Sequence, residues 1–229
     1  MWSQIAEELP RFFGYYNVIF FANALGVTFA LSAIGCLVGF SMGFVLATVR
    51  MSKRPSLMPL RALVTLYIEL FRRIPFLVTL MLVFFIFQGL KADLSMFMVA
   101  LISVCLIATA FIAEIVRSGL ESVHQNQWDA AATLNFSYWQ TLQMVVIPQA
   151  WKIILPPAFG FFVLFIKDTA LASQIGVIEL AFAGKAMSNK GFSATLVYGT
   201  VLVLYFMLSY PLSRFGKYLE TKLAPTRNR

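Results

Sequence analysis

Apolar runs long enough to cross a lipid bilayer recur along this chain, and they limit its fold more than any other feature. The runs reach roughly 17 residues or more, and about 20 residues of helix span the hydrocarbon core. Hydrophobic residues make up 60% of the 229 residues, whereas charged residues make up 12%. Backbone polar groups in lipid must bond internally, so such runs favour helices. The sequence therefore predicts an all-α integral membrane protein.

Five spans are expected, all within one domain that covers residues 1–229. Polar segments between the apolar runs set the approximate limits of the spans. The predicted spans are residues 18–49, 62–90, 94–113, 153–183 and 194–212. The first is longer than one crossing needs, so we expect it to be tilted or bent, and Pro75 breaks the second.

Glycines at a spacing of four residues mark the first span. Gly35, Gly39 and Gly43 form overlapping GxxxG patterns. This spacing permits close approach of a second helix. The ordinary frequency of glycine in membrane helices explains the pattern equally well.

Basic residues gather near the ends of the predicted spans, which indicates how the chain is oriented. The net charge of +8 is also typical of nucleic-acid binding, but the positions at span ends fit membrane topology better. With the C-terminal tail inside, thirteen basic residues lie on the inner side: Arg50, Lys53, Arg54, Arg61, Arg72, Arg73, Arg117, Lys152, Arg214, Lys217, Lys222, Arg227 and Arg229. Four lie outside, namely Arg11, Lys91, Lys185 and Lys190. The positive-inside rule therefore predicts a cytoplasmic C-terminus and an external N-terminus.

A polar segment, residues 114–152, separates the third and fourth spans. It is longer than the usual connection of about 4–6 residues, and the charge count places it in the cytoplasm. Asn126 as N-cap and Asp129 as N3 predict a helix beginning near Gln127, with Asn135 as its left-handed C′ residue. Ser137 and Gln140 form the capping-box pattern of a second helix, which should end before Pro148. Such a hairpin is either a partner surface or a solvated amphipathic hairpin.

The motifs in and around this segment carry a resemblance to a known family. Asp129-Ala130-Ala131, followed by Asn135 and then Val145, Ile147 and Pro148, is similar to the EAA loop of ABC importer permeases. The stretches AEIVRSGLESV, WQTLQMVVIPQA, YIELFRRIPFLV and KDTALASQIGVIEL agree as well. Together they resemble the polar amino acid permease family over most of the chain, from about Gly26 to Tyr210.

The resemblance implies the transmembrane subunit of a type I importer, with five helices and a cytoplasmic coupling helix. In that family the coupling helix docks into a cleft of an ATP-binding cassette subunit, and a periplasmic or extracellular binding protein delivers the substrate. Two permease subunits, identical or paralogous, form the pathway. Carried over, the coupling helix is residues 127–134, and the coupling residues are Gln127, Asp129, Ala130, Ala131, Asn135 and Pro148.

Three positions depart from the family pattern. Asp129 stands where the family has Glu, and Asn135 stands where it has Gly. The tripeptide at residues 124–126, His-Gln-Asn, replaces a common Pro-x-Gly. These departures concern the start and the end of the expected coupling helix.

We expect no catalytic activity in this chain. The sequence lacks the G-x-x-x-x-G-K-[ST] phosphate loop, so ATP and its Mg²⁺ are expected to be hydrolysed by a partner subunit. A metal site is not expected, because His124 is the single histidine and Cys36 and Cys105 lie within apolar spans without metal-ligand spacing.

Charged residues at membrane depth are the other candidates, because each costs about 2.5–3.5 kcal/mol at a helix centre. Around the break in the fourth span, we expect a contribution to the substrate pathway from Lys167, Asp168, Thr169 and Ser173. Glu69 is expected to pair with Arg72 or Arg73 at helical spacing. For Glu179, a gate and an outer-edge position both remain open.

Two functions from different classes follow. The favoured one is a permease subunit of an ATP-driven importer for a polar amino acid or derivative, in the bacterial inner membrane. The alternative is a stand-alone ion-coupled secondary transporter with Lys167 and Asp168 as its coupling site. The sequence leaves the substrate, and the choice between homodimer and heterodimer, open.

Overall fold

Helices account for nearly all of the described chain, and the long ones follow the apolar runs. The computed structural model describes residues 2–52 and 54–223. Lys53, Arg227 and Arg229, which were assigned above to the inner side, lie outside the described residues.

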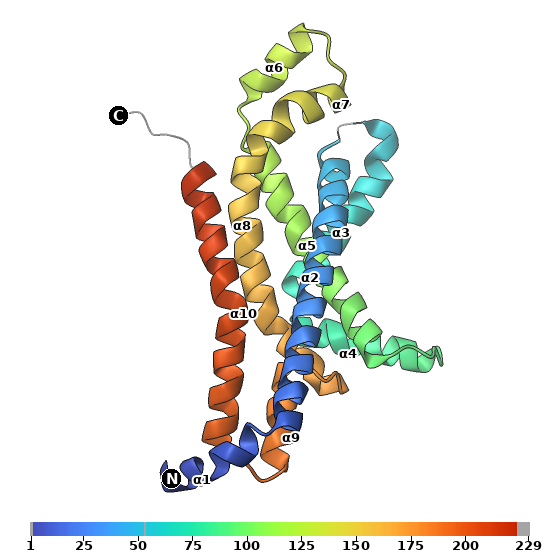
Figure 1. Cartoon of the computed structure of the whole chain (residues 1–229). Helices are drawn as coiled ribbons and strands as arrows, with labels where there is room; N and C mark the ends of the chain where they lie inside the picture. The colour runs from blue at the N-terminus through green and yellow to red at the C-terminus, as the bar shows by residue number, and fades with distance from the viewer. Residues whose placement is uncertain (1, 53, 224–229) are drawn as a thin grey trace. The chain divides into compact units, whose positions relative to one another are not determined.

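Ten α-helices occur within the described residues, with three short helical turns of other types between them (Figure 1). The α-helices are α1 (Trp2–Phe12), α2 (Tyr15–Met51), α3 (Met58–Arg73), α4 (Phe76–Gly89), α5 (Met96–Glu121), α6 (Gln125–Thr133), α7 (Tyr138–Thr141), α8 (Ile147–Asp168), α9 (Leu180–Asn189) and α10 (Ala194–Leu223). The other turns are 3-10 turns at Pro55–Leu57 and Thr169–Ile175 and a π turn at Leu142–Val146.

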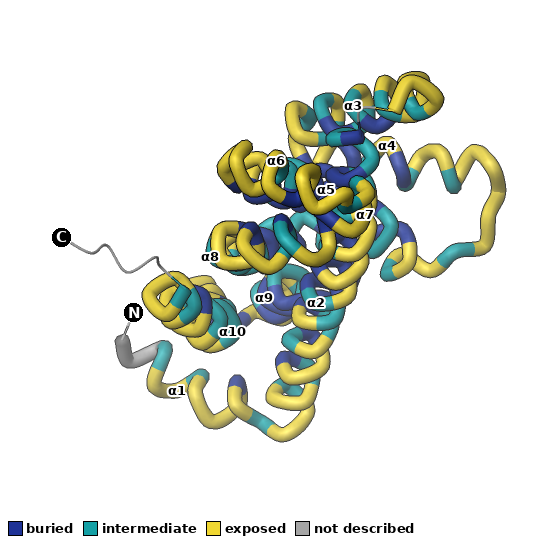
Figure 2. The backbone as a smooth tube through the Cα atoms, turned by 90° about the horizontal axis from the view of Figure 1, so that it is seen from above, coloured by how far each residue is buried: buried dark blue, intermediate teal, exposed yellow. Residues whose placement is uncertain are grey.

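Four helical runs are long and apolar enough to cross a membrane, namely α2, α5, the run from Tyr138 to Ile175, and α10. Helices α3 and α4 form a fifth candidate when they are counted as one broken span. The break falls at Pro75, the N-cap of α4, as the sequence predicted. Helix α10 is exposed along most of its length (Figure 2). The expected all-α membrane fold is therefore confirmed.

The chain forms two compact units whose stretches alternate along the sequence. The first unit comprises Met1–Leu37, Ile74–Cys105 and Val163–Pro211. The second comprises Val38–Arg73, Leu106–Phe162 and Leu212–Arg229. Four of the five boundaries fall inside α2, α5, α8 and α10, so these helices belong partly to each unit, and the fifth falls between α3 and α4.

A buried carboxylate organises the first unit. Glu179 is fully buried and N-caps α9, because its side chain accepts hydrogen bonds from the backbone N–H groups of Ala181 and Phe182 at 3.0 and 2.8 Å. The hydroxyl of Tyr205 on α10 donates a third hydrogen bond to it at 2.8 Å. The predicted fourth span, which reached residue 183, instead turns at Gly176, where φ is 89°. Glu179 therefore joins α9 to α10.

Close contact between α2 and α5 confirms the role of the glycine spacing. A Cβ atom at Gly39 would lie 2.6 Å from the Cβ of Ala108, and one at Gly43 would lie 2.8 Å from the backbone N of Ala113. In the first unit, a Cβ at Gly35 would lie 2.0 Å from a methyl group of Val104. The contacts advance along both helices in the same direction, so the two helices run parallel. A side chain at these positions would separate them.

Gly39→Ala should destabilise the protein, whereas Gly26→Ala should not. A Cβ at Gly39 meets the backbone of α5, and overpacking of this kind costs about 1–3 kcal/mol. A Cβ at Gly26, on the same helix, meets nothing within 4 Å. The thermal unfolding midpoints of the two purified variants in detergent measure the difference. Equal midpoints would contradict the contact.

Candidate functional site

The polar segment between α5 and α8 forms a helical hairpin of α6 and α7 (Figure 1). It is shorter than the sequence predicted, because α5 continues to Glu121 and so includes Glu114 and Arg117. Arg117 pairs with Glu114 three residues earlier and with Glu121 four residues later. Pairs at these spacings stabilise a helix. They explain why the helix extends beyond the apolar run.

Helix α6 begins two residues earlier than predicted. Its N-cap is His124, whose Nδ1 accepts a hydrogen bond from the N–H of Asn126 at 3.2 Å. The prediction of Asn126 as N-cap was wrong, because an imidazole nitrogen two residues upstream already satisfies an N-terminal N–H group. Asp129 consequently lies in the second turn, where its Oδ1 accepts a hydrogen bond from Gln125 at 3.0 Å.

The end of α6 follows the prediction. Asn135 has φ of 59°, in the left-handed region. Its N–H donates to the carbonyl of Ala132 at 2.9 Å, and the N–H of Phe136 donates to Ala131 at 3.1 Å. These two bonds make a Schellman motif. Asparagine thus performs the turn that glycine usually makes, at some cost in strain.

The second helix starts as predicted and ends differently. Ser137 and Gln140 form both bonds of the capping box that begins α7. Helix α7 ends at Thr141, but the helical run continues through the π turn into α8 and does not stop before Pro148. Proline lacks an N–H and clashes with the carbonyl four residues earlier in a regular helix. The wide π turn just before it, closed by the bond from Ile147 N–H to Leu142, accommodates this defect.

The two faces of α6 differ in exposure. Gln127, Asp129 and Ala130 are exposed, whereas Ala131 is 2% exposed and Trp128 is half-buried. Positions 128 and 131 are three apart and share the face that packs toward the π turn. The expected contact role of Ala131 therefore does not fit, because its side chain faces the interior. Asn135 and Pro148 are also exposed, and in the sequence they lie before and after α7.

A charged cluster within the same unit joins the last turns of α2 and α3 to α5. Glu114 on α5 pairs with Arg117 at 2.5 Å, with Arg50 of α2 at 2.8 Å and with Arg72 of α3 at 3.6 Å. The side chain of Glu114 is 19% exposed. Removing Glu114 would leave three partly buried arginines without their shared carboxylate, so the cluster holds α2 and α3 to α5.

The predicted pairing of Glu69 is correct for one of its two candidates. Glu69 pairs with Arg73 at 2.8 Å, four residues on, and with Arg50 at 3.5 Å. Arg72 instead turns to Glu114. Helical spacing can predict ion pairs between residues three or four positions apart, such as Glu69 and Arg73. It could not predict the pair of Arg72 and Glu114, because these residues lie 42 positions apart in the chain.

The residues predicted for the substrate pathway lie at the end of α8. Asp168 is half-buried at the last position of the helix, and Lys167 is exposed. The hydroxyls of Thr169 and Ser173 donate to backbone carbonyls of their own turn, each at 2.7 Å. Within the described part of the chain, no ion pair joins Lys167 or Asp168 to another side chain. Their role in a pathway stays a prediction.

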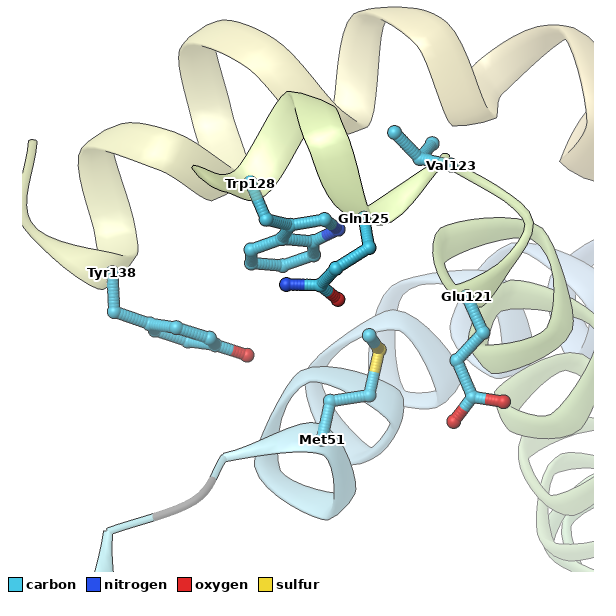
Figure 3. A pocket seen from close by; sticks show the side chains of 6 residues that line it. All are labelled: Met51, Glu121, Val123, Gln125, Trp128 and Tyr138. Carbon is cyan, nitrogen blue, oxygen red and sulfur yellow. The ribbon is translucent and has the colours of Figure 1, made fainter. Parts of the chain in front are cut away.

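A cavity of about 360 Å³ lies beneath the hairpin, within the second unit (Figure 3). Its lining side chains are Met51, Glu121, Val123, Gln125, Trp128 and Tyr138. The rings of Trp128 and Tyr138 stack with centroids 6.1 Å apart at an angle of 27°. Sequence reasoning missed this site, because its residues come from four helices, α2, α5, α6 and α7, and from the turn before α6.

Residues 39–224 match the protein family described as binding-protein-dependent transport system inner membrane component. The chain is 34% identical over 202 residues to the probable amino-acid ABC transporter permease protein YckA of Bacillus subtilis, with 88% of each chain covered. It is 32% identical to the L-cystine transport system permease protein TcyB of the same organism, covering 86% of this chain and 83% of that protein.

Two solved structures share the fold. One is an amino acid ABC transporter with histidines, with a TM-score of 0.81, 25% identity, and coverage of 90% of this chain and 94% of that one. The other is the inward-facing MetNI methionine ABC transporter, with a TM-score of 0.78, 20% identity, and coverage of 93% and 100%. The second likeness concerns the fold alone.

Glu114→Gln should lower the free energy of unfolding by about 2 kcal/mol, because three arginines lose their shared carboxylate. Glu220→Gln, at an exposed position on α10, is the matched control and should change little. Denaturant unfolding of both variants in detergent measures the effect. An unchanged midpoint for Glu114→Gln would show that the cluster does not hold the helices.

Asn135→Val should loosen the end of α6, whereas Asn135→Gly should not. A β-branched residue in the left-handed region costs about 1–2 kcal/mol, and glycine adopts it freely. Hydrogen exchange of the backbone amides of residues 134–136 reports the change. Equal protection in the valine and glycine variants would argue against the Schellman turn.

Proposed function

The chain belongs to the family of binding-protein-dependent transport system inner membrane components, and we propose that it imports a polar amino acid or a derivative as one permease subunit. Relatives whose names refer to amino-acid and L-cystine transport support this substrate class. The observation that carries the proposal is helix α6. It is a short helix on a hairpin between two long apolar helices, with an exposed acid and an exposed alanine.

The exposed face of α6 is the proposed docking surface for an ATP-binding cassette subunit, which holds and hydrolyses ATP with Mg²⁺. Ala130 leaves a shallow surface, and Asp129 and Gln127 present polar groups beside it. Asn135 closes the helix behind them. Ala131 packs inward and positions the helix, and Pro148 shapes the wide turn at the start of α8.

Bonds within the second unit supply a route by which a movement of α6 reaches the helices. The hairpin is continuous with α8 through the π turn and joins α5 through three residues. Glu114 then connects α5 to Arg50 on α2 and Arg72 on α3. Closure of the ATPase would move α6, and these connections would reorient the helices to give alternating access. Hydrolysis would reset the pathway.

The charge count supports an inner-membrane protein with a cytoplasmic hairpin and C-terminus and an external N-terminus. A binding protein would deliver substrate on the outer side, and a second permease subunit would complete the pathway. Residues 1–229 would act as one permease domain. Asp168 and Lys167, at the end of α8, are candidates to contact the charged groups of the substrate, with Thr169 and Ser173 nearby.

Uptake by the reconstituted complex tests the function. The permease, its ATPase subunit and its binding protein are placed in proteoliposomes, and accumulation of labelled polar amino acids is measured. Accumulation should require both ATP and the binding protein. Accumulation by the permease alone under an ion gradient would overturn the proposal in favour of a stand-alone carrier.

Asp129→Arg should leave membrane insertion intact and abolish co-purification with the ATPase, because it inverts a charge in the centre of the docking face. Asp93→Arg is the matched control, since Asp93 is exposed in the turn between α4 and α5, on the proposed outer side. The control should retain the ATPase and full uptake. Unchanged co-purification of Asp129→Arg would count against the coupling role of α6.

A further inference from the structure

The cavity beneath the α6–α7 hairpin contains a hydroxyl without a partner. The side-chain oxygen of Tyr138 is buried, and within the described residues no group hydrogen-bonds to it. Figure 3 shows this hydroxyl pointing in among the other lining side chains, on the side of Met51. An unsatisfied buried hydroxyl costs free energy, so native structures usually supply a partner.

The lining groups favour a guest that donates hydrogen bonds. Gln125 uses its Nε2 to donate to Asp129, which leaves its carbonyl oxygen as an acceptor. Arg117 engages Oε2 of Glu121, so the other carboxylate oxygen can accept. With the Tyr138 hydroxyl, these groups place three oxygens from three elements around the cavity.

The aromatic rings indicate the charge and the shape of that guest. Trp128 and Tyr138 are stacked at 27°, and both line the cavity. The faces of such rings attract cations, and a planar guanidinium both stacks on them and donates several hydrogen bonds. A volume of about 360 Å³ greatly exceeds the roughly 30 Å³ share of one water molecule and accommodates a long side chain.

We propose that this cavity receives an arginine side chain of the ATPase subunit, which donates a hydrogen bond to the Tyr138 hydroxyl. Trp128 and Gln125 belong to α6 itself, so the cavity lies behind the proposed docking face, on the inner side of the same helix. The carboxylate of Glu121 complements a basic guest. The inference rests on the proposed function, since it takes the ATPase as partner, and it adds a second docking point behind the helix.

Tyr138→Phe separates this role from a structural one. Removal of the hydroxyl should weaken binding of the ATPase to the permease in nanodiscs about tenfold, the effect of one hydrogen bond to a charged group. The unfolding midpoint of the permease alone should stay unchanged or rise, because the variant no longer buries a hydroxyl that lacks a hydrogen-bond partner. Tyr16→Phe, at a position 84% exposed, is the control and should alter neither quantity.

Two results of this experiment would overturn the inference. One is unchanged affinity of Tyr138→Phe for the ATPase. The other is a lowered midpoint of the variant permease alone, because the hydroxyl would then have its partner within this chain. If Asp129→Arg abolishes assembly while Tyr138→Phe does not weaken it, the proposed function stands and this inference alone fails.

Photocrosslinking identifies the guest directly. With p-benzoylphenylalanine in place of Tyr138, irradiation of the assembled complex should attach a peptide of the ATPase, and the peptide should contain arginine near the linkage. Crosslinks confined to the permease, or addition of a small cationic molecule instead of a peptide, would overturn the proposal.

Discussion

The close parallel contact of α2 and α5 is the constraint on which the second unit depends. Gly39 and Gly43 let the two backbones approach until an added Cβ would overlap α5. Because the helices run parallel, their later turns meet as well, and Arg50 reaches Glu114 at 2.8 Å. In lipid there is no hydrophobic force between helices, so packing of small residues and polar bonds must hold them together. Here the glycines allow the close packing, and Glu114 makes the polar bonds.

The charged cluster and the hairpin are joined by short, direct connections. Arg117 extends α5 beyond its apolar part by pairing within the helix, and α6 follows after three residues. On the other side, the π turn makes α7 and α8 continuous. Under the proposed function, these direct connections would pass a movement of α6 on to α5 and α8. The partly buried charges of Glu114, Arg50 and Arg72 thus connect the helix that leads into the hairpin to α2 and α3.

Local chemistry was readable from the sequence in several places. The capping box of Ser137 and the left-handed turn at Asn135 were predicted correctly, because each depends on residues within four positions of one another. The N-cap of α6 was missed, since histidine ranks below asparagine as a cap although its nitrogen accepts the same bond. Pro148 was taken as a helix end because a π turn has no sequence signal of its own.

The sequence by itself determined the membrane-spanning helices, the break at Pro75 and the place of the hairpin, because hydrophobic length, proline and capping act over short distances. Tertiary structure alone decided that Arg72 turns to Glu114 and that Ala131 faces inward. It also brought Tyr138, Trp128 and Met51 around one cavity. These contacts join residues from separate helices, and their geometry depends on how closely those helices pack, which no local pattern encodes.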